Sequence, residues 1–376
     1  MKTIIYVAPN YHINQTYATK SLLDKGWKVI FLSQRVSPKQ DYSFLKPKII
    51  GYNFISKLLS GLFFEKNSTE EWKFLTKYGI PPVKLIKLFK REKPSLIIIR
   101  GHSLYSFFAF ISTMFLGIND KCVFYTQNPI NDKIRLNLRY KIVDFFFPKT
   151  EITPINGDCI ISYKNKNRKF YVPLVIEKQI SIVKPKTGKN IKIITVAQFQ
   201  ERKRILELIK VFNRLLEFNK NIELNIFGNC VTKNDEVYFE NISRYITENN
   251  FGDSISLNRD ISHSQVMNEY KKSDIFVLPS IREPASFSIL EAMASGLPII
   301  VSTDNGLKEY VEHGSNGYIF EKDNYLKLEQ FLKNLVSNSG LRYSFGKRSL
   351  ELIDEKYTPD KYYDGLIKVI NHIENQ

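Results

Sequence analysis

Short runs of apolar and β-branched residues recur along the chain, separated by polar or amphipathic segments long enough to form a helix. Uninterrupted runs of this kind are typical of parallel strands that are buried on both faces. The sequence therefore predicts repeated strand–helix units. The predicted strands cover residues 3–8, 27–33, 95–100, 121–126 and 158–163 in the first half, and 191–197, 222–228, 253–258, 274–280 and 297–302 in the second.

A segment between the two series breaks this rhythm. Residues 165–190 are rich in lysine and contain Pro173, Pro185 and Gly188, which is typical of a linker. The chain of 376 residues is also too long for one compact core. We therefore expect an α/β protein of two Rossmann-like domains, residues 1–174 and 175–359, with a cleft between their sheets and ligands beyond the carboxyl ends of the strands.

Positive charge is distributed unevenly between these halves. Residues 1–174 contain 28 Lys and Arg against 11 Asp and Glu, an excess of 17, whereas residues 175–376 contain 27 of each. Such a division indicates that the first half faces a polyanion: nucleic acid, an anionic membrane or a phosphorylated substrate. Nucleic acid is disfavoured, because no stacking-aromatic motif or recognition helix accompanies the charge.

Several features bear on location. The apolar run near the N-terminus is too short for a signal peptide, and the stretch 104–117 is too short to span a membrane and predicts a buried helix. Three scattered cysteines favour a reducing cytosol over a disulfide framework or a zinc site. Residues 52–64 and 83–93 interleave lysines with Leu, Ile and Phe. Such stretches suit either an anionic membrane surface, which would make the protein peripheral at the inner face of the membrane, or ordinary amphipathic helices packed on the sheet.

Two cations follow the strand predicted at 191–197. A helical repeat of apolar residues begins near Arg204, which places Arg202 and Lys203 in the turn between strand and helix. Free backbone N–H groups and the helix dipole favour an anion at such a turn.

Two glutamates flank another helix start. Glu283 lies in a loop interrupted by Pro284, and Glu291 lies in the helix that this loop leads into. The N–H groups from about Phe287 to Leu290 would suit a phosphate, whereas carboxylates on either side would suit hydroxyl groups. A nucleotide-sugar satisfies all three, with its ribose and sugar at the acids and its diphosphate at the helix start.

The segment PSIREPASFSILEAMASGLPIIVS resembles the E-x7-E signature of GT-B glycosyltransferases, in particular the retaining family 4 (group 1) enzymes. Together with Arg202 and Lys203, the resemblance covers about residues 191–320, and the first half agrees in rhythm only. It implies a GT-B fold, an acceptor-binding first domain, a donor-binding second domain, and a C-terminal helix of about 360–376 that returns to the first domain.

The resemblance also implies residue roles. Glu291 would hold the ribose hydroxyls, and Glu283 would face the donor sugar near its reacting carbon. Arg202 and Lys203 would neutralise the diphosphate, which the backbone from Ser286 through Phe287 and Ser288 to Ile289 would cradle. Neither a metal nor another cofactor is expected, because no D-x-D sequence is present and cations with a helix N-terminus can stabilise the leaving phosphate.

Several positions depart from the family pattern. Ala197-Gln198 stands where members often have Gly-Arg, which makes Gln198 a candidate for the donor site, and His12 lies where a glycine pair is usual. Gln127 takes the place of a histidine found in many members, so it could bind a sugar hydroxyl but could not act as a base. His102, after an earlier strand, is a further candidate for contact with sugar or acceptor. Gly228, at the end of a strand, is a candidate for the donor site.

The function expected from these features is transfer of a sugar from a nucleotide-sugar to a glycan acceptor. A lipid-diphosphate-linked bacterial surface polysaccharide at the inner membrane face fits the charge and the apolar stretches of the first half. Two alternatives remain: a non-catalytic relative that binds a sugar-nucleotide or acts as a scaffold subunit, and a sugar-nucleotide epimerase on the same fold. The sequence does not name the donor base, the sugar or the linkage.

Overall fold

The computed structural model describes residues 1–35, 42, 44–101, 103–127, 150–156, 169–183 and 190–375. The chain divides into two compact units. The first consists of Met1–Pro154, Asp158–Val175 and Pro359–Gln376, and the second of Ile155–Gly157 and Ile176–Thr358. The predicted domain boundary lies between residues 174 and 175, beside the end of the first unit at Val175.

Among the described residues of the first unit, a parallel sheet of seven strands forms the centre, in the order β3-β2-β1-β4-β5-β6-β7. The strands are β1 (Thr3–Ala8), β2 (Lys28–Ser33), β3 (Lys48–Ile49), β4 (Leu96–Arg100), β5 (Cys122–Tyr125), β6 (Glu151–Thr153) and β7 (Lys169–Tyr171). In register, Tyr6 of β1 lies between Phe31 of β2 and Ile98 of β4. The chain crosses over from one side of β1 to the other, so the carboxyl end of β1 marks a topological switch point.

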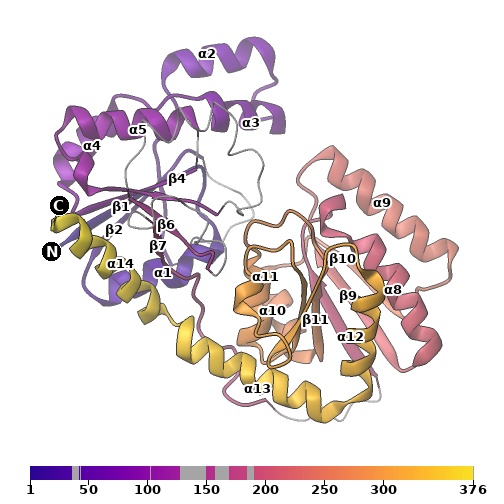
Figure 1. Ribbon diagram of the computed structural model, residues 1–376. Helices are drawn as coiled ribbons and strands as arrows, with labels where there is room; N and C mark the ends of the chain where they lie inside the picture. Colours follow the sequence, from indigo (N-terminus) through magenta and orange to yellow (C-terminus); the bar gives the residue numbers. More distant parts are fainter. Residues whose placement is uncertain are drawn as a thin grey trace. The chain divides into compact units, whose positions relative to one another are not determined.

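Helices cover both faces of this sheet (Figure 1). On one face, α1 (Thr16–Asp24) and α14 (Pro359–Glu374) share a core with β1, β2 and β4. On the other face, α4 (Lys84–Glu92) and α5 (Leu104–Phe115) close a second core. The hydroxyls of Tyr6 and Tyr362 lie 2.9 Å apart, which fixes α14 to the central strand. Coverage on both faces explains why β1 and β4 are apolar except at one end, where Thr3 begins β1 and Arg100 ends β4.

The prediction of a linker over residues 165–190 is wrong for residues 169–175. Residues Lys169–Tyr171 form the edge strand β7, and Val172 and Val175 are fully buried in the core of the first unit. Lys169 and the following Pro173 conceal the strand, because an edge strand needs only one ladder of hydrogen bonds and Lys169 is paired with Glu151 of β6, at 3.6 Å. The strand predicted at 158–163 lies outside the described residues.

The two stretches in which basic residues alternate with apolar ones, 52–64 and 83–93, behave differently. Helix α4 buries Leu85, Leu88 and Phe89, so the 83–93 stretch is an ordinary helix packed on the sheet. Helix α2 (Phe54–Phe63) does the opposite. It buries Ser56 and Ser60, while its large apolar side chains face outward.

Hydrogen bonds of two serine side chains hold α2 in this orientation. The Oγ of Ser56 accepts from the N–H of Ile80, at 2.9 Å, and the hydroxyl of Ser60 donates to Glu71 of α3 (Thr69–Tyr78), also at 2.9 Å. Helix α5, predicted to be buried, leaves Phe115 81% exposed at its end. Of the helices that the structure describes, none combines the length and apolar character needed to cross a membrane.

In the second unit, the part of the chain that the structure describes forms a parallel sheet of six strands in the order β10-β9-β8-β11-β12-β13. The strands are β8 (Ile191–Val196), β9 (Ile222–Gly228), β10 (Ile255–Arg259), β11 (Ile275–Leu278), β12 (Ile299–Ser302) and β13 (Gly317–Phe320). On one face lie α8 (Ile205–Phe218), α9 (Lys233–Glu248) and α12 (Tyr325–Ser337), which enclose the largest apolar core of this unit. Helices α10 (His263–Lys272) and α11 (Phe287–Ala294) cover the other face (Figure 1). The predicted α/β class is confirmed.

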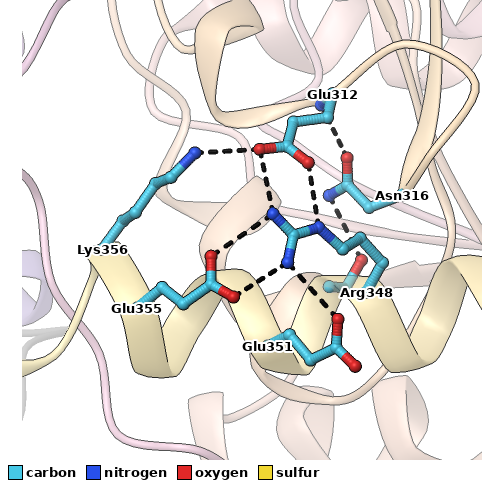
Figure 2. A network of polar contacts seen from close by, with 7 residues as sticks. Glu312, Asn316, Arg348, Glu351, Glu355 and Lys356 are labelled. Carbon is cyan, nitrogen blue, oxygen red and sulfur yellow. Dashed lines mark hydrogen bonds and ion pairs between the residues drawn. The ribbon is translucent and has the colours of Figure 1, made fainter.

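A charged network fixes α13 (Ser339–Lys356) to the segment that precedes β13. Arg348 donates from Nε to Glu312, at 2.9 Å, and from its other nitrogens to Glu351 and Glu355 (Figure 2). Lys356 also contacts Glu312, at 2.8 Å. Facing acids hold the pKa of the Arg348 guanidinium above its ordinary value, and its hydrogen bond holds the pKa of Glu312 below its own.

Candidate functional site

The loop after β8 carries the two predicted cations. It includes a short 3-10 helix, η5 (Glu201–Lys203), and α8 then begins at Ile205, one residue after the helix start expected from the sequence. Arg204 between them adopts the left-handed conformation, with φ of 55°. This turn directs Lys203 inward, where it is only 6% exposed.

The loop after β11 carries Glu283, and backbone contacts with the segment after β12 fix it. The Glu283 N–H donates to the carbonyl of Asp304, at 3.0 Å, and the Gly306 N–H donates to the carbonyl of Glu283, at 2.8 Å. A Cβ on Gly306 would stand 1.9 Å from the carbonyl oxygen of Pro284. Only glycine lets these two loops approach so closely.

The structure brings Glu283 together with Arg202 and Lys203, about 80 residues away in sequence. Because β8 and β11 are neighbours in a parallel sheet, their carboxyl ends meet at one edge. Glu283 Oε2 accepts from Arg202 Nη1 at 2.7 Å and also from Lys203 Nζ. Arg202 Nε donates to Gln200, at 2.9 Å. We call Arg202, Lys203 and Glu283 the charged triad.

Burial and opposite charges act against each other on the side chains of the charged triad. Glu283 is 4% exposed, so both it and Lys203 are almost completely removed from water. Burial lowers the pKa of the Lys203 amine, the Glu283 carboxylate opposes that shift, and Arg202 adds to it. Two cations on one carboxylate leave one net positive charge, which suits an anionic ligand.

Glu291 lies in the second turn of α11, and both of its oxygens have partners. Oε1 is 2.7 Å from Nε2 of His263, the first residue of α10, and Oε2 accepts from the Tyr270 hydroxyl at 3.2 Å. Burial and then the Glu291 carboxylate raise the pKa of Tyr270 well above its ordinary value. Sequence reasoning missed His263 and Tyr270, since no motif marks them and only packing of α10 on α11 brings them to Glu291.

The start of α11 leaves its first N–H groups without a side-chain cap. Ser286 is the N-cap residue, but its hydroxyl lies 2.7 Å from that of Ser288 and does not cap the helix. Ile289 donates only to the Ser286 carbonyl, at 3.2 Å. The positive end of the helix dipole and uncapped N–H groups together favour an anion beside Ser286, Phe287 and Ser288.

Two other predicted donor residues lie at neighbouring strand ends. Gln198 follows β8 and is half-buried. Gly228 ends β9, where an added Cβ would lie 2.1 Å from the carbonyl oxygen of Ala197. Close backbone packing explains this glycine by itself, so its role in donor binding stays a prediction.

The candidates in the first unit also follow strands. His12 comes after β1, and burial, with smaller effects of Arg100 and Arg35, lowers the pKa of its imidazole to about 4. Gln127 comes after β5, accepts a hydrogen bond from Arg100 at 2.9 Å and donates one to the Tyr125 hydroxyl at 2.8 Å. His102 lies outside the described residues. Neither Arg35 nor Arg100 was singled out in the sequence, because no motif contains them.

Across the described ranges, no group of three or more His, Cys, Asp or Glu side chains could hold a metal ion. The absence of a metal requirement stays a prediction.

Comparison with known proteins gives a family for most of the second unit. Residues 177–351 match the family described as "Glycosyl transferases group 1". The chain is 22% identical over 206 residues to the poly(glycerol-phosphate) alpha-glucosyltransferase of Bacillus subtilis (strain 168), a match that covers 54% of this chain and 29% of that protein. It is 24% identical over 176 residues to the capsular polysaccharide biosynthesis glycosyltransferase CapM of Staphylococcus aureus, covering 47% and 44% respectively. The matches thus span less than half the length of these relatives.

Among solved structures, Anabaena Alr3699/HepE in complex with UDP aligns over 99% of this chain and 100% of its own, with a TM-score of 0.72 and 11% identity. At that identity the likeness concerns the fold. Residues 177–351 are thus similar in sequence to group 1 glycosyl transferases, and the chain has a GT-B fold built of two Rossmann-like units.

Proposed function

We propose that this protein is a retaining, metal-independent glycosyltransferase that moves a sugar from a nucleotide-sugar to a glycan of a bacterial surface polysaccharide. The observation that carries the proposal is the charged triad at one edge of the sheet, within the segment that matches the group 1 family. The names of two relatives, a poly(glycerol-phosphate) glucosyltransferase and a capsular polysaccharide enzyme, support the acceptor class. The UDP complex of a structure with this fold supports a nucleotide donor.

The donor would bind along the edge formed by β8, β11 and α11. Its diphosphate would lie against Arg202, Lys203 and the uncapped start of α11. Breaking the bond between sugar and phosphate adds negative charge to the diphosphate, and preorganised cations stabilise that charge without reorganising during the reaction. Glu283 would orient both cations and face the sugar, while Glu291, held by His263 and Tyr270, would accept from the ribose hydroxyls.

A thermal-shift panel of UDP-, GDP-, ADP- and CMP-sugars tests this donor site. One nucleotide class should raise the melting temperature, and Lys203→Ala and Glu291→Ala should each abolish the rise. Lys210→Ala, which removes an exposed lysine of α8, is the matched control and should leave the rise intact. No stabilisation by any nucleotide at millimolar concentration would refute the donor site.

Turnover then separates the candidate activities. The stabilising nucleotide-sugar should be consumed only when a glycan acceptor is present, and the product should retain the anomeric configuration of the donor, as read by NMR. Conversion of the donor without an acceptor would indicate an epimerase instead. Binding without turnover across a panel of lipid-linked acceptors would indicate a non-catalytic subunit. Activity that survives EDTA would support independence from metal.

The lipid-linked acceptor and a peripheral position at an anionic membrane are supported by the outward face of α2. Its large apolar side chains remain exposed, with Phe54 at 77% and Phe63 at 72%. Lys57 is exposed on the same helix, and the half of the chain that contains α2 carries the whole positive excess. Apolar side chains with a basic residue beside them suit the boundary between acyl chains and anionic headgroups.

Vesicle sedimentation tests this membrane proposal. The protein should co-sediment with vesicles rich in phosphatidylserine and remain in solution with phosphatidylcholine alone. Leu62→Glu together with Phe63→Glu should release it, whereas Leu326→Glu, a change at an equally exposed residue of α12 in the second unit, should not. Equal binding of all these proteins would refute a role for α2.

A further inference from the structure

Three basic side chains follow three neighbouring strands of the first unit. Arg100 ends β4, His12 lies four residues after β1, and Arg35 lies two residues after β2. The sheet order β2-β1-β4 places these strand ends side by side, at the topological switch point of the sheet. Both arginines act electrostatically on His12, which indicates that the three groups share one neighbourhood.

The guanidinium of Arg100 is fixed by neutral partners. Its Nη2 donates to Gln127 at 2.9 Å, and its central carbon lies 5.5 Å from the centre of the Tyr125 ring. Gln127 is held in turn by the Tyr125 hydroxyl. Burial lowers the pKa of Arg100, and only Tyr125 opposes that shift.

The guanidinium of Arg35 stacks on an aromatic ring. Its central carbon lies 3.7 Å from the centre of the Trp72 ring, and its Nε is buried without a hydrogen-bond acceptor. Stacking uses the flat face of the group and leaves the N–H donors at its edge available. Burial also lowers the pKa of Arg35, and only tyrosines oppose that shift.

No carboxylate among the described residues forms an ion pair with Arg35 or Arg100. In the second unit, by contrast, the buried Lys203 has Glu283 as its counter-charge. A desolvated cation without a counter-charge is costly and attracts an anion that can complete the site. Arginine binds phosphate and carboxylate groups in the plane of its fork, often through two parallel hydrogen bonds.

We propose that Arg35, Arg100 and His12 bind an oxyanion, a phosphate or a carboxylate group, carried by the glycan acceptor. This inference rests on the proposed transferase function and names the class of acceptor: an anionic glycan instead of a neutral one. Gln127 is a positioning residue in this site, since it holds Arg100 in place. The excess of positive charge in residues 1–174 would draw such an acceptor toward this unit.

The test measures binding of inorganic phosphate to the full chain carrying Lys203→Ala, which removes one of the cations of the donor site. Adding Arg35→Gln or Arg100→Gln should weaken phosphate binding by roughly tenfold or more, since each removes a charged hydrogen-bond donor. Arg35→Lys and Arg100→Lys keep the charge and should retain part of the affinity. These lysine variants also decide the matter if a glutamine variant fails to fold.

A second readout follows His12 directly. Saturating phosphate should move the NMR titration of the His12 imidazole upward from a pKa of about 4, because a nearby anion favours the protonated ring. A purely structural role for the arginines would leave this titration unchanged. Unaltered phosphate affinity in the arginine variants, or an unmoved His12 titration, overturns the inference.

Two further arms complete the design. Glycerol phosphate and glucuronate, compared on the same protein, identify which oxyanion the site prefers. The nucleotide-sugar panel should also be repeated on the arginine variants made with Lys203 intact. The donor should raise their melting temperature as much as it does that of the wild type. If the donor still raises the melting temperature while the arginine substitutions leave phosphate affinity unchanged, the anion site is refuted and the donor site stands.

Discussion

Replacing Glu283 by Gln should destabilise the second unit strongly, because it leaves Lys203 buried with no counter-charge. Lys203 is 6% exposed and Glu283 4% exposed, so water cannot compensate for the lost carboxylate. Removing one partner of a buried ion pair costs about 3–5 kcal/mol. Arg202, with its side chain 30% exposed, can turn outward, which places the expected loss at about 3 kcal/mol. For a unit of this size that lowers the melting temperature by roughly 6–12 °C.

The loss should also depend on pH. Glu283 raises the pKa of Lys203, and burial and Arg202 lower it, so Glu283→Gln lowers it further. Between that lowered pKa and the unfolded value of about 10.4, the unfolded chain binds more protons than the folded chain. The free energy of unfolding then rises with pH in this interval. The deficit relative to wild type should therefore shrink as the pH is raised from 7 toward 10.

Chemical denaturation of three variants measures this coupling. The double variant Lys203→Met/Glu283→Gln removes both charges and should be more stable than Glu283→Gln alone. Glu291→Gln is the matched control: it is a carboxylate of similar burial, 6% exposed, but its partners are His263 and Tyr270. The stability deficit of Glu291→Gln relative to wild type should not shrink as the pH is raised toward 10. A Glu283→Gln protein as stable as wild type, or a double variant no more stable than Glu283→Gln, would refute the reasoning.

Three further predictions concern other parts of the chain. Gly306→Ala should lower the free energy of unfolding by about 3 kcal/mol and weaken nucleotide binding, because its Cβ would stand 1.9 Å from the Pro284 carbonyl oxygen. Calorimetry should show no such loss for the control Gly252→Ala, where an added Cβ meets nothing within 4 Å. Arg348→Met should cost about 1 kcal/mol in urea denaturation, and less in 1 M salt, because its glutamate partners are partly exposed. The Cys122 thiol, whose pKa burial raises to about 12, should resist iodoacetamide at pH 8 until the protein unfolds, as peptide mass mapping can show.

Apolar runs located most of the core strands correctly, and the strands that they failed to predict share a common feature. β1 has the bounds expected from the sequence, and β8 and β12 differ from theirs by one or two residues. The strands missed, β3, β6, β7 and β13, are two to four residues long and lie toward the sheet edges. A short strand near an edge carries too few apolar positions to stand out from a loop, and its place is decided by pairing with a neighbour that is distant in sequence.

The amphipathic stretches show the same limit. Residues 52–64 contain one lysine and residues 83–93 four lysines and one arginine, and both interleave basic with apolar residues. Helix α4 nevertheless buries its apolar face, whereas α2 exposes it. The difference depends on Ser56 and Ser60, whose hydroxyls find partners in Ile80 and Glu71. Which face of a helix is buried depends on what the surrounding elements offer, and a single helix sequence does not contain that information.

The sequence by itself determined the α/β class, the two series of strands, and the local positions of Arg202, Lys203, Glu283 and Glu291 at strand and helix ends. These are local properties, set by periodicity and by the chemistry of turns. Only the tertiary structure decided their partners: the ion pairs of Glu283 with both cations, and the contacts of Glu291 with His263 and Tyr270. Contacts between residues far apart in sequence follow from the order of strands in a parallel sheet, and that order is fixed by the packing of the whole unit.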